Sequence, residues 1–383
     1  MRVIAAFDSF KGSMSSQRAN EAAERALREA GINKIECIPI ADGGEGLTDA
    51  LLASVGGEKI TVRAQDPLGR RIDAFYGWVE EEKLAIIEMA AASGLPHLRA
   101  DELNPYEAST FGTGQLVQAA LDRGARKIII GLGGSATVDG GTGCLEALGI
   151  RFLDEQNKEL RGTGGSLHKI KAIDRTVLDP RLAETEVVIA SDVTNPLTGR
   201  EGAVHIFGPQ KGIKPDELHT FDEAMQQYQR VAEAAMGMST GNEPGTGAAG
   251  GLGFALRTFL NGTFISGAEL IIQLANIEEK VQQADLILTG EGKFDTQSLF
   301  GKAPIGICQL AKKHCVPAIV FAGKVEFEEM SIPSHGVSLL VPMVDSVISL
   351  DEAMENGAEL LSRAVKRTVT AIQIGEGLKK SKC

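Results

Sequence analysis

The chain has 383 residues, of which 43% are hydrophobic and 5% aromatic, and its formal charge is −12. This charge argues against a nucleic acid or an anionic membrane as partner, because both call for a concentrated basic face. No apolar run approaches the roughly 18 residues of a membrane span, and the apolar stretch at residues 3–7 is too short for a signal peptide. We therefore expect a cytoplasmic protein, and its length suggests two domains.

The N-terminal part of the chain alternates between strand and helix patterns. Residues 3–7 read as a buried strand, residues 17–30 as a helix that stops at Gly31, residues 35–40 as a second strand and residues 47–54 as a second helix. This rhythm predicts a parallel sheet.

The rhythm breaks in the middle of the chain. Polar and apolar residues alternate from about residue 60 to residue 87, which suits antiparallel strands. Further on, a helix is predicted over residues 114–121, strands over 127–130 and 186–190, and a helix over 215–236. The middle region therefore reads as a mixed α/β unit.

The first rhythm returns after about residue 281, with strands predicted over residues 284–288, 317–321 and 337–341. Because both ends of the chain share this pattern, we infer that they build one parallel sheet. The middle region would then be an inserted domain.

Three glycine-rich acidic loops are expected to carry the chemistry. They are ADGGEG at residues 41–46, GLGGSATVDGG at residues 131–141 and TGEGKFD at residues 289–295, and each follows an apolar run that reads as a buried strand. Glycine lets a ligand approach the backbone, whose N–H groups can hold phosphate oxygens, while carboxylates can hold Mg²⁺. The loops therefore point to phosphate chemistry, although turns and acidic helix starts would also explain parts of them.

A fourth polar segment, DSFKGS at residues 8–13, follows the first predicted strand. In open parallel sheets ligands bind at this edge, and the following helix N-terminus favours an anion. Asp8 suits a metal or proton role and Lys11 a phosphate contact, whereas Ser13 or Ser15 is expected to cap the helix.

Weaker signals come from three other turns. SDVTNP holds Asp192 and Asn195 at a strand end, where an Asx turn is the structural alternative. Lys211 stands in the turn FGPQKG, and Glu88 precedes a glycine in EMAAASG.

The chain lacks the phosphate-loop pattern G-x-x-x-x-G-K-[ST], a G-x-G-x-x-G after the first strand and the protein-kinase motifs. A phosphotransferase built on these loops would be of another kind.

Nine motifs in order resemble the glycerate kinase family of the bacterial type that phosphorylates D-glycerate with ATP. They cover nearly the whole chain and read DSFKGS, ADGGEG, EMAAASGL, GTGQL, GLGGSATVDGGTG, SDVTNPLTG, FGPQKG, PGTGAAGGLG and TGEGKFDTQS.

The resemblance implies an α/β fold of two domains with the active site in the interdomain cleft. A flavodoxin-like parallel-sheet domain would comprise residues 1–62 and 283–383, and an inserted mixed α/β domain residues 63–282. ATP and Mg²⁺ are implied as cofactors, D-glycerate as substrate and 2-phosphoglycerate as the favoured product. A kinase that forms 3-phosphoglycerate is the alternative. We expect a monomer or a homodimer with no nucleic-acid or membrane partner.

The site hypothesis assigns three roles to residues of these motifs. The catalytic residues are Asp8, Lys11, Asp192 and Lys293. The hydroxyl proton could pass to Asp8, Asp192 or Asp295, and Asp192 is favoured because it belongs to the other predicted domain. Substrate or phosphate is expected to contact Ser9, Gly133, Gly134, Ser135, Asn195, Gly290 and Gly292. Mg²⁺ is expected at Asp42, Glu45 or Asp295.

Two other functions fit the same loops less well. A small-molecule kinase with a GLGSSA-like phosphate loop would have a proline upstream of GLGGSAT, where this chain has Lys127 and three isoleucines. A non-catalytic regulator that senses a sugar acid would leave the many loop carboxylates without a role.

Overall fold

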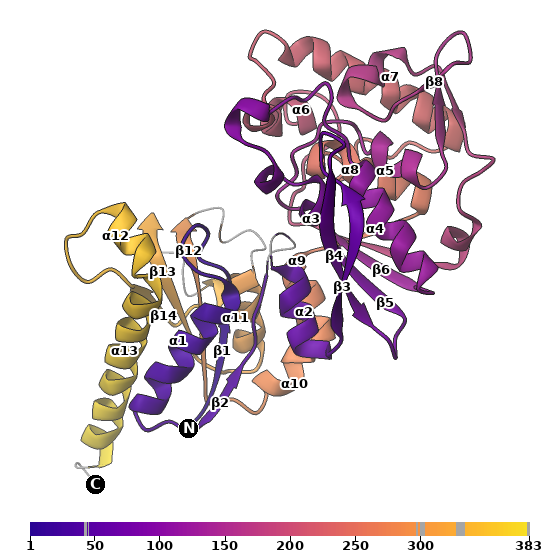
Figure 1. The fold of residues 1–383 in the computed structure, drawn as a ribbon. Helices are drawn as coiled ribbons and strands as arrows, with labels where there is room; N and C mark the ends of the chain where they lie inside the picture. The colour runs from indigo at the N-terminus through magenta and orange to yellow at the C-terminus, as the bar shows by residue number, and fades with distance from the viewer. Residues whose placement is uncertain (42–43, 45, 296–297, 299–302, 327–333, 381–383) are drawn as a thin grey trace. The chain divides into compact units, whose positions relative to one another are not determined.

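The structure, a computed structural model, describes residues 1–41, 44, 46–295, 298, 303–326 and 334–380. Two compact units divide the chain (Figure 1). Unit 1 comprises Met1–Asp42, Asp49–Val55 and Gly267–Cys383, and unit 2 comprises Gly43–Thr48 and Gly56–Ser266. The unit junctions at Gly56 and Gly267 precede residues 63 and 283, where the sequence predicted domain boundaries. That the active site lies between two domains stays a prediction.

Within the described residues, unit 1 contains a five-stranded parallel sheet. Its strands are β1 (Arg2–Phe7), β2 (Lys34–Cys37), β12 (Leu286–Asp295), β13 (Ala318–Glu326) and β14 (Leu339–Pro342), in the order β14-β13-β12-β1-β2. Counted within the unit, this is the flavodoxin-like order 2-1-3-4-5, in which the chain reverses direction across the sheet between β1 and β12. The expected parallel sheet built from both chain ends is therefore confirmed.

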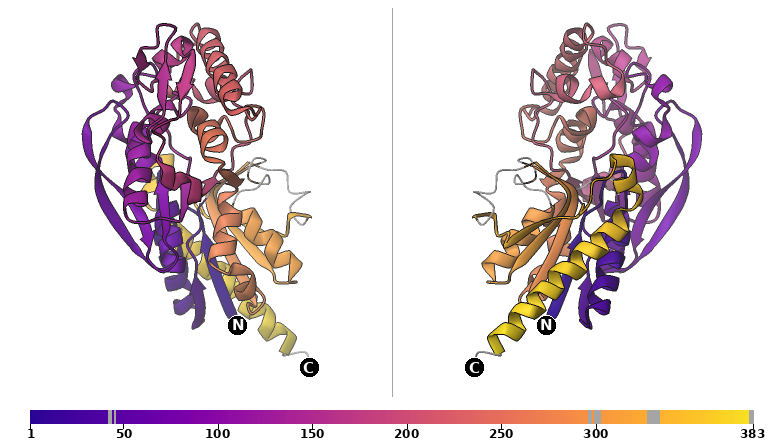
Figure 2. Two further views of the ribbon diagram at one scale, coloured as in Figure 1. Left: turned by 90° about the vertical axis from the view of Figure 1, so that its right-hand side faces the viewer. Right: turned by 90° about the vertical axis from the view of Figure 1, so that its left-hand side faces the viewer.

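Helices cover both faces of this sheet. On one face α1 (Ser16–Glu29) and α13 (Gly357–Lys380) pack against each other and on the sheet, and Figure 2 shows α13 running along that face. On the other face α11 (Ala303–Lys313) contacts the central strands, with α9 (Gly267–Leu274) and α10 (Ile277–Val281) beside it. The remaining helices are α2 (Leu47–Val55) and α12 (Leu350–Glu355).

The apolar pattern of α1 shows why this segment forms a buried helix. Ala19, Ala22, Ala23, Ala26 and Leu27 recur at helical spacing and are all buried. Ser15 accepts a hydrogen bond from the backbone N–H of Arg18, so Ser15 is the N-cap.

The main sheet of unit 2 is mixed, and the antiparallel strands predicted between residues 60 and 87 are confirmed. Its described strands are β3 (Glu58–Gln65), β4 (Arg71–Val79), β5 (Leu84–Glu88), β6 (Lys127–Gly131), β10 (Glu186–Ala190) and β11 (Thr263–Ile265), in the order β11-β10-β6-β5-β4-β3. The strands from β3 to β5 are antiparallel, whereas β5, β6, β10 and β11 are parallel.

A second, antiparallel sheet of unit 2 was not predicted. It joins β7 (Arg151–Leu153), β8 (Glu159–Leu160) and β9 (Ala172–Asp174) in the order β8-β7-β9. Strands of two or three residues are too short to show a period-2 pattern.

The helices of unit 2 enclose one large apolar core. They are α3 (Ala90–Ser93), α4 (Phe111–Asp122), α5 (Thr142–Ala147), α6 (Ala203–Phe207), α7 (Leu218–Met236) and α8 (Ala248–Leu260). Short 3-10 turns lie at Leu95–His97, Ala100–Glu102, Gly164–Lys169, Pro180–Glu184 and Pro209–Lys211. The core includes the fully buried Trp78 and Tyr228.

The cysteines differ in burial. Cys144 and Cys308 are buried, whereas Cys37 is half-buried. No helix among the described residues combines the length and the apolarity needed to cross a membrane.

Candidate functional site

Two buried carboxylates stand where the strand order of unit 1 reverses. Phe7 of β1 pairs with Gly290 of β12, so Asp8 and Glu291 follow this pair on neighbouring strands. The Asp8 backbone N–H donates to the Gly290 carbonyl at 3.0 Å, and the exposed fractions of Asp8 and Glu291 are 4% and 5%. The sequence suggested a specific role for Asp8 but not for Glu291, although both directly follow a buried strand core.

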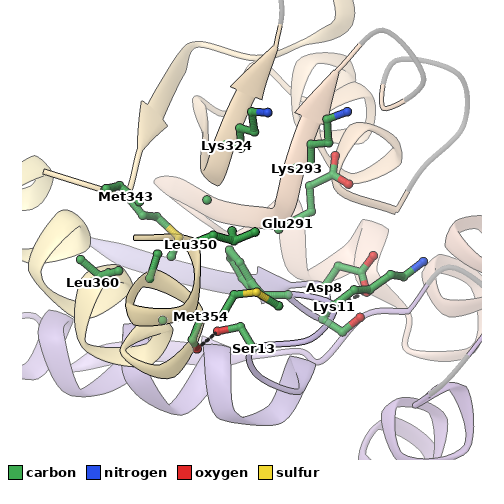
Figure 3. A pocket seen from close by; sticks show the side chains of 17 residues that line it. Asp8, Lys11, Ser13, Glu291, Lys293, Lys324, Met343, Leu350, Met354 and Leu360 are labelled. Atoms are coloured by element: carbon green, nitrogen blue, oxygen red, sulfur yellow. Dashed lines mark hydrogen bonds between the residues drawn. The ribbon is translucent and has the colours of Figure 1, made fainter. Parts of the chain in front are cut away.

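These carboxylates line a pocket of about 380 Å³, called the unit 1 pocket below. Figure 3 shows the charged side chains of Asp8, Lys11, Glu291 and Lys293 on one side of the view, and the apolar ones on the other. Its lining residues are Asp8, Ser9, Phe10, Lys11, Ser13, Glu291, Gly292, Lys293, Gly323, Lys324, Met343, Val344, Leu350, Ala353, Met354, Gly357 and Leu360.

A tight turn brings Lys11 to this pocket. The backbones of Phe10 and Met14 exchange hydrogen bonds of 2.9 and 3.0 Å across the turn, and Gly12 has a φ of +80°. A Cβ on Gly12 would lie 2.4 Å from Met354 Cε, so the turn needs glycine for both its conformation and its packing. Ser13 Oγ donates to the Met354 carbonyl at 2.5 Å, which ties the turn to α12.

The loop predicted at residues 289–295 is in fact part of a strand. β12 continues to Asp295 because it pairs with β13 in parallel as far as Asp295 opposite Glu326. The prediction that residues 289–295 form a loop is therefore wrong. Gly290 lies inside the sheet, where a Cβ would approach the Phe321 carbonyl oxygen to 2.1 Å. Gly292 remains at the pocket wall.

Two charged residues at the end of β12 are held by neighbours. Lys293 Nζ lies 2.6 Å from a Glu326 carboxylate oxygen and 3.1 Å from one of Asp295, and these contacts raise the pKa of Lys293, Glu326 first. Asp295 also accepts a hydrogen bond from the Ser298 backbone N–H at 3.2 Å. Lys293 is thus held in its charged form beside the unit 1 pocket.

Two of the expected metal ligands, Asp42 and Glu45, lie outside the described residues. Among the residues that are described, no group of three or more His, Cys, Asp or Glu side chains could hold a metal ion. Asp8 and Glu291 are nevertheless two oxygen donors at one pocket, and Mg²⁺ commonly takes one or two carboxylates together with substrate phosphates.

The parallel strands of unit 2 bring a second set of loops together. Gly131 at the end of β6 pairs with Glu88 of β5 on one side and with Ala190 of β10 on the other. The loops that begin at Leu132 and Ser191 therefore leave the same edge of the sheet. The backbone N–H of Leu132 donates to the Ala190 carbonyl at 3.2 Å.

The predicted nest at Gly133, Gly134 and Ser135 is a tightly packed turn. A Cβ on Gly133 would lie 2.4 Å from the Cα of Gly44, and Gly134 has a φ of +75°. Ser135 forms an isolated backbone bridge with Gly94. Side chains larger than hydrogen would not fit at Gly133.

Two acidic residues near this turn support the backbone. Glu88 accepts hydrogen bonds from the backbone N–H groups of Gly46 and Thr48 at 3.2 and 2.8 Å, at the start of α2. Asp139 is fully buried and accepts from Thr110, Gly141 and Gly143. Burial raises the pKa of Asp139, and these hydrogen bonds oppose that effect. Both carboxylates therefore have a structural role, since each accepts hydrogen bonds from backbone N–H groups.

Lys211 is a candidate functional residue for which the sequence suggested no role. Its side chain is only 2% exposed, and Nζ donates to Ser135 Oγ at 2.6 Å and to the Thr137 carbonyl at 2.8 Å. Burial lowers the pKa of Lys211 to about 7, although the negative charge of Asp139 acts in the opposite direction. Its only sequence signal was a lysine in a glycine–proline turn.

Lys211 lines a small pocket of about 160 Å³, called the unit 2 pocket below. It contains the three nest residues, and most of its other lining residues are apolar. The lining residues are Leu95, Leu132, Gly133, Gly134, Ser135, Val193, Phe207, Gln210, Lys211 and Ala249. A buried cation beside a turn of glycines is suited to a small anion.

Asp192 and Asn195 follow β10 at this same edge. Asp192 is half-buried, and its neighbour Val193 lines the unit 2 pocket. The Asn195 side-chain amide donates to the Glu201 carbonyl at 2.7 Å, and the Asn195 carbonyl accepts from the Gly247 backbone N–H at 2.9 Å. Asn195 therefore holds the loop in shape, whereas Asp192 directly precedes a residue that lines the pocket.

Comparisons with known proteins agree over nearly the whole chain. The model of the glycerate kinase family matches residues 3–373. The chain is 40% identical over 380 residues to a glycerate kinase of Bacillus subtilis (strain 168), covering 98% of this chain and 99% of that protein. It is 39% identical over 376 residues to the glycerate 2-kinase of Escherichia coli (strain K12), again covering 98% and 99%.

A solved structure gives the same result for the fold. A crystal structure named as a glycerate kinase 2 from Salmonella typhimurium LT2 aligns with a TM-score of 0.87 at 36% identity, covering 98% of this chain and 99% of that one.

Proposed function

The chain belongs to the glycerate kinase family, and we propose that it transfers the γ-phosphoryl group of ATP to the 2-hydroxyl of D-glycerate. The preference for the 2-hydroxyl is supported by the relative named a glycerate 2-kinase. The assignment of glycerate as acceptor depends on one observation. The buried cation Lys211 lines a pocket suited to a small acid.

The unit 2 pocket would hold glycerate by its carboxylate. At about 160 Å³ it suits a three-carbon acid and is well below the roughly 300 Å³ at which sites for larger ligands begin. The carboxylate would accept from Lys211 Nζ and from the backbone N–H groups of the turn at Gly133 and Gly134. The apolar side chains around the pocket would strengthen this pairing by excluding water.

Asp192 remains our candidate for the base. It directly precedes Val193, which lines this pocket, whereas Asp295 is engaged by Lys293. As the glycerate hydroxyl oxygen bonds to the γ-phosphorus, the bond from that phosphorus to the leaving ADP oxygen breaks, and the hydroxyl proton passes to the Asp192 carboxylate. Asp8 is the alternative proton acceptor.

The polar side of the unit 1 pocket would hold the phosphates of ATP. Lys11 and Lys293 supply positive charge there, and Ser9 and Gly292 line the same wall. Asp8 and Glu291 would hold Mg²⁺, which neutralises phosphate charge when bound. The sequence candidates for the same ion remain Asp295, Asp42 and Glu45. Gly290 allows β12 to pack closely against β13.

We also infer a cytoplasmic protein that works as a monomer or a homodimer. The formal charge of −12 supports small-molecule partners over nucleic acids.

The role of the carboxylate can be tested by comparing D-glycerate with its methyl ester as acceptor. The ester keeps both hydroxyl groups but cannot pair with Lys211. We expect ATP-dependent ADP release with D-glycerate and a kcat/KM for the ester that is lower by at least about tenfold. Equal kcat/KM values for the two compounds would contradict the assignment.

A further inference from the structure

We propose that the unit 1 pocket binds the adenosine part of ATP on an apolar wall formed by Met343, Leu350, Met354 and Leu360. This proposal rests on the proposed function, because it takes ATP to be the phosphoryl donor. It adds the part of the site that recognises the nucleotide rather than its phosphates.

The apolar wall is built from three consecutive elements at the carboxyl end of the unit 1 sheet. Met343 directly follows β14 and is 2% exposed, and Leu360 of α13 is also 2% exposed. Leu350, at the start of α12, is 74% exposed although it lines the pocket. The wall therefore has a buried base and an open rim, which a flat ring could cover.

Single exposed leucines are common on protein surfaces and need no ligand. Leu350 differs because the buried Met343 and Leu360 line the same pocket (Figure 3). Its position is also fixed. Ser349 caps α12, with its Oγ accepting from the Glu352 backbone N–H at 3.2 Å while Glu352 accepts from the Ser349 backbone N–H at 2.9 Å.

The opposite side of the pocket carries the charges. Lys11, Glu291 and Lys293 lie there, so one pocket combines an apolar wall with a charged one (Figure 3). This polarity matches a ligand with an aromatic ring at one end and an anionic chain at the other. Of the two substrates in the proposed reaction, only ATP has that form, since glycerate has no ring.

The size of the pocket agrees with this choice. Its volume of about 380 Å³ falls within the range of roughly 300 to 1,000 Å³ that is usual for small-molecule sites lined mainly by apolar side chains. It lies at the carboxyl ends of β1 and β12, where open parallel sheets of this order bind ligands.

The test replaces Leu350 with glutamine, which keeps the side-chain length, removes an apolar contact and adds no charge. Because Leu350 is mostly exposed at the first position of α12 and glutamine is a good helix former, Leu350→Gln should fold normally. Val347→Gln is the matched control, since Val347 is fully exposed, lies three residues away and does not line the pocket.

Binding is measured by calorimetry with two probes, the nonhydrolysable analogue AMP-PNP with Mg²⁺ and inorganic tripolyphosphate with Mg²⁺. We expect the Kd of AMP-PNP to rise about five- to tenfold in Leu350→Gln and to stay unchanged in Val347→Gln. Tripolyphosphate has no ring and should bind the wild type and both variants alike.

An unchanged Kd of AMP-PNP in Leu350→Gln would overturn the proposal, as would a failure of the wild type to bind AMP-PNP. Loss of tripolyphosphate binding to the same extent as AMP-PNP would also overturn it, because the residue would then act on the phosphates. Glycerate is absent from these measurements. Weaker AMP-PNP binding in Leu350→Gln in a protein that leaves glycerate unphosphorylated would therefore support the pocket while refuting the proposed function.

Discussion

Lys211 gives the proposed acceptor site a distinct dependence on pH. Burial lowers the pKa of the lysine to about 7 in the free protein, and Asp139 is the neighbouring charge that opposes this shift. The protonated form, which pairs with a carboxylate, therefore predominates below pH 7 and is lost as the pH rises above it. Glycerate stays anionic throughout this range.

The KM for glycerate should accordingly be lowest below pH 7 and rise about fivefold between pH 7 and pH 8. Lys211→Met should raise this KM and remove its dependence on pH. The measurement is initial-rate kinetics from pH 6 to pH 9, with the KM for ATP as the internal control. A KM for glycerate that stays constant over this range in the wild type would show that Lys211 does not bind the carboxylate.

Asp192 is the residue on which the proposed proton transfer depends. Asp192→Asn keeps the shape of the side chain but cannot accept the proton, so we expect kcat to fall about 10²- to 10⁴-fold while both KM values change little. Asp154→Asn is a control in the same unit, because Asp154 only accepts backbone hydrogen bonds in a turn, as asparagine can. A near-normal kcat in Asp192→Asn would exclude Asp192 as the base.

Single residues show where the sequence pattern was sufficient and where it was not. Asp8 and Lys11 could be placed at a pocket because they directly follow a clear apolar strand. Lys211 could not, since nothing in FGPQKG indicates that the lysine is buried and bonded to Ser135, 76 residues earlier. Glu88 and Asp139 are carboxylates, as many metal ligands are, so the sequence does not distinguish a metal-binding role from a structural one. The hydrogen bonds that they accept from backbone N–H groups reveal the structural role.

At the scale of elements, β12 shows how local composition can mislead. Glycines and charges after Leu288 are typical of a loop, so the sequence predicted that the strand ended there. The partner strand β13 supplies hydrogen bonds through Asp295, and that pairing depends on residues about thirty positions away in the chain. In contrast, β10 and α1 were predicted to within one residue, because their apolar patterns are uninterrupted.

Gly290 should be required for the pairing of β12 with β13. A Cβ there would approach the Phe321 carbonyl oxygen to 2.1 Å, so Gly290→Ala should cost about 1–3 kcal/mol or more of stability. Gly375→Ala is the matched control, because Gly375 is an exposed position in α13 with no atom within 4 Å of an added Cβ. That change should stabilise by about 0.5–1 kcal/mol.

Thermal unfolding followed by circular dichroism checks this pair of variants. The midpoint should fall clearly for Gly290→Ala and rise slightly or stay constant for Gly375→Ala. An unchanged midpoint for Gly290→Ala would mean that the strands can separate there at little cost.

At the scale of the whole molecule, the proposed function assigns each substrate its own pocket. The unit 1 pocket joins an apolar wall to charged residues at the reversal point of a flavodoxin-like sheet, and the unit 2 pocket presents a buried lysine beside a glycine turn. The rhythm of strands and helices at the two chain ends was enough to predict the first sheet. The residues that line each pocket come from distant segments, so their meeting could not be predicted from spacing.

The central claim is that the protein forms 2-phosphoglycerate from D-glycerate and ATP. The most direct measurement supplies D-glycerate, ATP and Mg²⁺ and follows phosphoenolpyruvate formed by added enolase, first without and then with phosphoglycerate mutase. We predict phosphoenolpyruvate without the mutase, since enolase acts on the 2-phosphate directly. Phosphoenolpyruvate that forms only after the mutase is added would show phosphorylation of the 3-hydroxyl instead, and a failure to form ADP from ATP in the presence of glycerate would contradict the kinase reaction itself.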